Sequence, residues 1–190
     1  MELLLGVFSA FGLSASAGLN AYIPLLAIGV IAHYFPSTLN LNQPWDMIAN
    51  PWILILLGVL VIIEMLADKI PAVNHINDII QTFVRPAAGA VAFAASAKVI
   101  TDVHPVLALA CGLLVAGSVH VAKSAVVRPV VTATTAGAGN IPVSILEDVI
   151  STITSILAIL LPIIMAIFII GVITLALWWW SRRTDKTQTA

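Results

Sequence analysis

Two carboxylates, Glu64 and Asp68, lie four residues apart near the end of a long apolar segment, so a helix would place them on one face. A carboxyl group held inside a membrane can carry a proton or ligate an ion, because burial makes its charged form costly. The adjacent Lys69 could neutralise one of the two. The alternative is a structural ion pair between helices, of the type Glu64–Lys123 or Asp68–Arg128.

A second group of side chains is basic and lies at the end of another apolar segment. Three- and four-residue spacing places His120, Lys123 and Ser124 on one helical face. Arg85 and Arg128 each precede a proline suited to a first helical turn, where free amides and arginine side chains both favour anions. These residues predict a site for an anionic head group or solute. The alternative is that they are cationic anchors at the membrane surface.

Two short segments of small residues, 17–24 and 136–142, each contain an asparagine followed by an Ile-Pro pair. Together with the recurring Val-Arg-Pro triplets, they indicate a pseudo-repeat of broken or re-entrant helices. Breaks of this kind point to a binding site, because freed backbone groups at membrane depth need partners. Asn20 and Asn140 therefore join the candidate site. Close helix packing by the small residues is the alternative.

The adjacent carboxylates Glu147 and Asp148 follow the second break. They are hard to neutralise together, so either one faces water in a loop or the pair attracts a cation. Common enzyme motifs such as Gly-x-Ser-x-Gly, His-Glu-x-x-His and the phosphate loop are absent from the sequence. We expect no catalytic residue, no metal site and no cofactor. An intramembrane hydrolase that uses a metal held by Glu64, Asp68 and His120 is kept as an alternative, although their spacing matches no recognised ligand pattern.

The composition predicts an integral membrane protein. Hydrophobic residues make up 61% of the chain and charged residues 9%, and the mean hydropathy is +1.09. This is too little polar surface to cover a water-soluble globule of 190 residues. A net charge of -1 gives no basic field for nucleic acid, and the single Cys111 excludes an internal disulfide.

The apolar pattern predicts an all-α helical bundle in one transmembrane domain, residues 1–180, with a polar tail at 181–190. We expect an amphipathic helix at 71–84 to lie in the membrane interface. Segment 129–146 either crosses or re-enters. About six spans are expected, at residues 3–34 (interrupted near 14–20 and at Pro24), 52–67, 86–101, 105–122, 129–146 and 153–180.

The distribution of positive charge predicts the orientation. The loop at 35–51 has no Lys or Arg, whereas Lys69, Arg85, Lys123 and Arg128 would share the other side with the C-terminal tail. Because cytoplasmic loops carry an excess of Lys and Arg, six crossings would place both termini in the cytoplasm.

The motifs in order are Ser-Ala-Gly-Leu-Asn-Ala-Tyr, Glu64-x3-Asp68-Lys69-Ile-Pro, Val-Arg-Pro, His120-x2-Lys123-Ser-x3-Arg128-Pro, Thr-Thr-Ala-Gly-x-Gly-Asn and Glu147-Asp148. This combination resembles a family of bacterial multi-pass membrane proteins catalogued as domain-of-unknown-function family 4126, over about residues 10–175. The resemblance implies a bacterial inner-membrane location and supports the choice of motif residues. It supplies no reaction.

Together, these observations predict a small transporter or channel-like protein with a polar intramembrane site for a small ion, an anionic solute or an anionic lipid head group. The alternative is a non-transporting assembly or lipid-binding scaffold, in which the polar residues only hold helices together. The expected partners are the lipid bilayer and a second copy of the chain, which a transporter of 190 residues would use to enclose a path.

Overall fold

The computed structural model describes residues 2–96 and 104–188, and it confirms the all-α prediction, with no strand in those residues. The helices are α1 (Glu2–Leu19), α2 (Tyr22–Tyr34), α3 (Pro51–Ala67), α4 (Pro71–Ser96), α5 (Pro105–Ala122), α6 (Arg128–Thr135), α7 (Asn140–Leu160) and α8 (Pro162–Gln188), with a short 3-10 helix η1 (Trp45–Ala49) and a π-helical segment η3 (Lys123–Val127).

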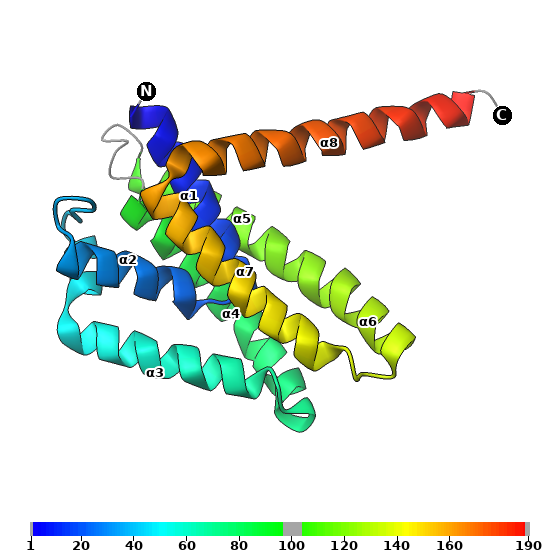
Figure 1. The fold of residues 1–190 in the computed structure, drawn as a ribbon, viewed down its shortest axis with the longest axis horizontal. Helices are drawn as coiled ribbons and strands as arrows, with labels where there is room; N and C mark the ends of the chain where they lie inside the picture. The colour runs from blue at the N-terminus through cyan, green and yellow to red at the C-terminus, as the bar shows by residue number, and fades with distance from the viewer. Residues whose placement is uncertain (1, 97–103, 189–190) are drawn as a thin grey trace.

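The predicted single span at 3–34 is two helices that meet at Asn20, and the chain reverses there (Figure 1). Leu5 of α1 lines the same hollow as Thr38, which follows α2, so the start of α1 and the loop lie at one end of the bundle. The 35–51 loop was expected at the opposite end, and that expectation is wrong. Pro24 does not interrupt the chain, because it lies in the first turn of α2, where a proline needs no amide donor.

Helix α4 is continuous from Pro71 to Ser96, with Pro86 inside it. The prediction of two elements, an interfacial helix at 71–84 and a span at 86–101, is therefore wrong. Residues 97–101 of the predicted span lie outside the described part of the chain. The polar face of α4 caused the error. Gln81 and Arg85 are buried inside the protein and do not face water.

Helix α5, the π-helical segment and α6 form one helical run, Pro105–Thr135, which includes the start of the predicted 129–146 segment. The rest of that segment begins α7 after a turn in which Gly137 has a positive φ of 88°. The predicted 153–180 span is also divided, since Leu161 precedes a proline and leaves the helical region. Helix α8 then projects from the bundle (Figure 1) and includes residues 181–188, which were predicted as a tail.

Four described helices are long and apolar enough to cross a membrane: Ile76–Ser96, Pro105–Thr135, Asn140–Leu160 and Pro162–Trp179. Three more apolar helices, Leu5–Leu19, Tyr22–Tyr34 and Pro51–Ala67, are shorter. Because α1 and α2 are short helices that meet at a break, they form a discontinuous element inside the bundle. This element positions the polar residues described below.

Close contact between α4 and α5 depends on two glycines. A Cβ atom at Gly89 would lie 2.2 Å from the Cβ of Ala116, and one at Gly112 would lie 2.4 Å from the carbonyl oxygen of Gly89. The buried Ser14 hydroxyl lies 2.7 Å from the Gly112 carbonyl oxygen and 3.1 Å from that of Gly89, and donates to them. The contact therefore leaves no space for a side chain on either glycine.

Replacing Gly89 by valine is expected to lower the free energy of unfolding by about 1–3 kcal/mol or more, because overpacking forces helices apart. Thermal unfolding in detergent measures this change. Gly58→Val on α3 is the matched control, since a Cβ there meets nothing within 4 Å. Equal melting temperatures for the two variants would contradict the packing described.

Candidate functional site

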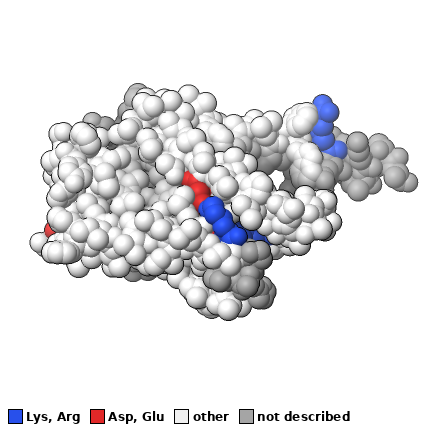
Figure 2. All heavy atoms as spheres, turned by 60° about the horizontal axis from the view of Figure 1, so that its bottom comes forward, with Lys and Arg blue, Asp and Glu red and all other residues white. Residues whose placement is uncertain are grey.

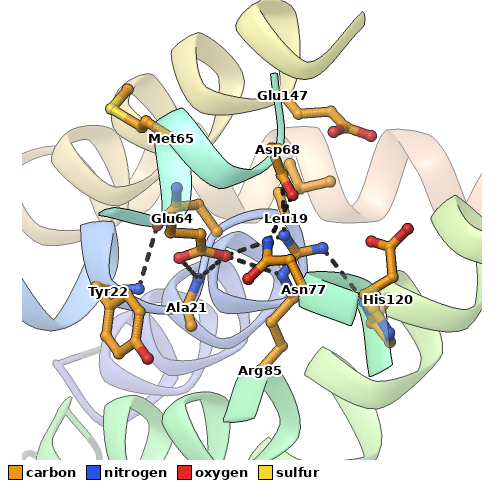
Figure 3. Close-up of polar contacts among 12 residues, drawn as sticks. Leu19, Ala21, Tyr22, Glu64, Met65, Asp68, Asn77, Arg85, His120 and Glu147 are labelled. Atoms are coloured by element: carbon orange, nitrogen blue, oxygen red, sulfur yellow. Dashed lines mark hydrogen bonds and ion pairs between the residues drawn. The ribbon is translucent and has the colours of Figure 1, made fainter. Parts of the chain in front are cut away.

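Charged side chains gather where α1 ends and α2 begins, and Figure 3 shows Glu64, Asp68, Arg85 and Glu147 among them. We call them the ionic network: Glu64, Asp68, Lys69, Asp78, Arg85, Lys123, Arg128, Glu147 and Asp148. They come from α3 and the residues after it, α4, the π-helical segment, α6 and α7. The network thus connects five segments that are distant in sequence.

Glu64 binds the first backbone amide after the break. Its carboxylate accepts a hydrogen bond from the Ala21 amide at 3.0 Å, and from Arg85 Nε at 3.1 Å and Nη2 at 2.9 Å. Arg85 is fully buried and Glu64 is 1% exposed. A negative charge at the start of α2 complements the positive end of that helix dipole.

Lys123 binds the other side of the break. Its ammonium group donates to the Leu19 carbonyl oxygen at 3.2 Å, which is at the end of α1, where the helix dipole is negative. The same nitrogen lies 2.7 Å from Glu147 Oε2 and 3.6 Å from Asp68 Oδ2. Each half-helix therefore ends on a buried charge of the stabilising sign.

Asn20 connects the break to α7. Its Oδ1 accepts from the amides of Tyr22 and Ile23, both at 3.2 Å, and its Nδ2 donates to Asp148 Oδ1 at 3.0 Å. Lys69 donates to the other oxygen of Asp148 at 3.1 Å. The expectation that Lys69 neutralises its neighbour Asp68 or Glu64 is therefore wrong, because its side chain turns to α7.

Asp68 is the centre of the network. Its Oδ2 lies 3.2 Å from Arg128 Nη2 and 3.3 Å from Arg85 Nη2, and its Oδ1 accepts from Asn77 at 2.8 Å. Of the two structural pairs suggested by the sequence, Asp68–Arg128 is present. Glu64 pairs with Arg85 and not with Lys123.

The model of a family described as a domain of unknown function (DUF4126) matches residues 7–182. The chain belongs to this family. The match covers the whole ionic network and agrees with the family that the sequence motifs indicated. No curated protein and no solved structure matches the chain.

His120 extends the network of this DUF4126 protein toward α4. Its Nδ1 lies 3.3 Å from Arg85 Nη1 and its Nε2 lies 3.1 Å from Thr82 Oγ1. Because arginine can only donate, Nδ1 must accept, and the bonded ring then donates from Nε2 to the threonine hydroxyl. That hydroxyl donates in turn to the Asp78 carbonyl oxygen at 2.8 Å. Ser124, predicted on the same face, instead bonds the carbonyl oxygen of Val121 on its own helix.

Asn140 lies outside the network, so its inclusion in the predicted site is a correction. It exchanges hydrogen bonds of 3.0 and 3.3 Å with Thr132 across the turn between α6 and α7. The second break is distant from the network. Glu147 and Asp148, the network residues of α7, lie about two turns after the start of that helix, which is about 11 Å at about 1.5 Å per residue. Both carboxylates are buried within that helix, and neither lies in a loop.

Sequence reasoning missed several polar partners. Asp78 pairs with Arg128 at 2.8 Å, yet its polar face was interpreted as facing water. The spacing of Asp78, Gln81 and Arg85 places all three on one face of α4, and that face was assigned to the membrane interface although Gln81 and Arg85 are buried. Two serines four residues apart on α7, Ser151 and Ser155, were also missed, and both lie 2.7 Å from the Ser16 hydroxyl.

The network lies within the candidate spans. Lys123 is about 27 Å from the start of the helical run Pro105–Thr135 at about 1.5 Å per residue, and Glu147 is about 11 Å from the start of Asn140–Leu160. In Figure 2 most of the described surface is uncharged, and a narrow stripe of acidic and basic atoms crosses it, apart from a basic cluster at the upper right and an acidic atom at the left edge. Lys69, Asp78 and Arg128 are the partly accessible members, with side chains 27%, 25% and 11% exposed.

The described residues contain no group of three or more His, Cys, Asp and Glu side chains placed to hold a metal ion. The arrangement brings ionisable groups into contact with one another and with the two helix ends at the break. Protons and small ions are the species that such groups can exchange.

Proposed function

We propose that this protein is a small membrane transporter or channel-like protein that moves a small ion through the ionic network at the α1–α2 break. The observation that supports the proposal most is the Glu64 carboxylate, which is bound to the Ala21 amide and to Arg85 inside the bundle. Discontinuous helices whose ends point at ionisable groups form ion sites in many transporters. Ionisable side chains at membrane depth are otherwise rare and usually functional.

The charge balance favours a proton or small cation over an anion. Four cationic side chains pair with five carboxylates, so a bound anion would have to displace a carboxylate from a partner. Arg85, the group best suited to bind an anion, is fully buried and already bonds Glu64. A proton or cation can instead bind at Asp68, because each of its three cationic partners also pairs with another carboxylate.

The second candidate function is a membrane scaffold. It is favoured by the way Glu64 and Lys123 satisfy the two helix ends at the break, which would hold the bundle together without any transport. Both accounts need the network for folding. Only the transporter account predicts ion flux.

Flux in liposomes tests the proposal. Reconstituted wild-type protein should dissipate an imposed gradient of H⁺, Na⁺ or K⁺, and Glu147→Gln should slow that flux by about tenfold or more, equivalent to about 1.4 kcal/mol of barrier. Glu147 suits this test because Asp68 remains as a partner for Lys123. Asp46→Asn, in the loop helix η1 away from the network, is the matched control and should leave flux unchanged. Wild-type flux equal to that of empty liposomes for every cation would contradict the proposal.

A further inference from the structure

Among the described residues, three buried oxygen atoms have neither a hydrogen-bond partner nor an ion pair: Asp78 Oδ1, Gln81 Oε1 and Ser144 Oγ. The whole Ser144 residue is 1% exposed and Gln81 is 2% exposed. Leaving a buried polar atom without a partner is costly, and folded proteins usually satisfy such atoms with protein groups or ordered water. Ordered water, or a bound group that can donate, would satisfy these atoms.

Contacts with Arg128 place these atoms in one region. Arg128 Nη1 lies 2.8 Å from Asp78 Oδ2, and its Nη2 lies 3.9 Å from Glu147 Oε2. Gln81 lies three residues from Asp78 on α4, and Ser144 three residues from Glu147 on α7, so each pair shares a helical face. Glu147 Oε2 itself is in an ion pair with Lys123, so its need for a donor is smaller than that of the three unpartnered oxygens.

This region is reachable from the surface. The side chains of Asp78 and Arg128 are 25% and 11% exposed, whereas Asp68, on the far side of Arg128, is 2% exposed. Side-chain exposure thus falls from Asp78 through Arg128 to Asp68.

We propose that water enters between α4, α6 and α7 and forms a hydrated site, with Gln81 and Ser144 on its wall, that binds small hydrogen-bond donors and small cations. The unpartnered atoms are oxygens that can accept a hydrogen bond. Two carboxylates, Asp78 and Glu147, balance the two cations, Lys123 and Arg128, so the unpartnered oxygens of Gln81 and Ser144 decide what binds. The site therefore selects donors and cations over anions. This proposal deepens the proposed function by naming where water and small cations enter the network. It rests on the proposed function only for movement of the bound species beyond this site.

Cysteine accessibility to Ag⁺ tests this site in reconstituted protein that carries Cys111→Ser. Ag⁺ replaces the thiol proton, so an S–Ag bond forms and H⁺ is released. Ser144→Cys should react at least about tenfold faster than the matched control Leu146→Cys, because only a thiol in contact with water ionises readily. Leu146 lies two residues further along α7 and is 56% exposed.

A second pair of variants tests the same site if Ser144→Cys does not fold. Gln81→Cys should react with Ag⁺ faster than Ile80→Cys, whose parent side chain is 53% exposed on the outer face of α4. The anion dicyanoaurate should react with neither buried cysteine faster than with its control. Equal Ag⁺ rates within both pairs would overturn the hydrated site, and faster reaction with dicyanoaurate than with Ag⁺ would overturn its selectivity.

Accessibility and flux fail independently. Unreactive cysteines in a protein that conducts cations would remove this entrance and leave the proposed function in place. Reactive cysteines in a protein without flux would keep the hydrated site and remove transport. Accessibility is measured without a gradient, so the two results do not depend on one another.

Discussion

Arg85→Gln is expected to destabilise the fold by about 3–5 kcal/mol, the usual effect of removing one partner from a buried ion pair. Arg85 is fully buried and its guanidinium group bonds Glu64, Asp68 and His120. Without it, the two carboxylates lose their shared cation inside the bundle. The drop should appear as a lower melting temperature in detergent, or as loss of the folded peak in gel filtration.

The double variant Glu64→Gln/Arg85→Gln should recover most of that loss. A neutral pair leaves no uncompensated charge at the start of α2, and a glutamine oxygen can still accept from the Ala21 amide. A double-mutant cycle isolates the coupling energy of the pair. Additive losses, or an Arg85→Gln variant as stable as wild type, would contradict the geometry described here.

Lys123→Met is expected to have the second largest effect, also about 3–5 kcal/mol. Its ammonium group is 3% exposed, pairs with Glu147 and donates to the Leu19 carbonyl oxygen at the end of α1. Both of those groups lose their buried partner in the variant. Chemical or thermal unfolding of the purified protein measures the loss.

Lys69→Met is the matched control for Lys123→Met. Lys69 also pairs with a carboxylate, Asp148, but its side chain is 27% exposed and Asn20 still donates to that carboxylate. Partly exposed pairs contribute about 0–1 kcal/mol. If the two lysine variants unfold at the same temperature, burial does not set the strength of these pairs.

Most members of the network could be predicted because their surroundings were apolar. A charge such as Glu64 or Lys123 in a hydrophobic segment needs a partner, and that requirement is visible in sequence. The identity of that partner could not be predicted, because helical spacing shows only which residues share a face of one helix. Lys69 and Asp148 are distant in sequence, so nothing local distinguishes their pairing from that of the adjacent Lys69 and Asp68.

The direction of the chain after a break was equally hidden. Asn20 and the small residues before it indicated where α1 stops, but the reversal into α2 depends on contacts with α3 and α7 made by Glu64 and Asp148. The same limit explains why Asn140 was wrongly included in the site. A similar local pattern at Asn140 only closes a turn through its hydrogen bonds with Thr132. Local sequence located the breaks, and long-range pairing decided which one became part of the network.

The reversal of the chain at Asn20 also changes what the positive charges imply about orientation in the membrane. The start of α1 lies at the end of the bundle opposite to the network, and every Lys and Arg of the network pairs with a carboxylate. These cations therefore serve as partners for buried acids as well as surface anchors. An orientation with both termini in the cytoplasm stays a prediction, to be tested by labelling the termini in intact cells.

The most direct test of the central claim is cation flux through liposomes that contain the Glu64→Gln/Arg85→Gln double variant, with its melting temperature measured on the same preparation. The account predicts a folded protein that melts near the wild-type temperature and conducts little, because the pair at the break is neutral and its carboxylate is gone. A folded double variant that conducts as well as wild type would contradict the claim that ions pass through the network at the α1–α2 break.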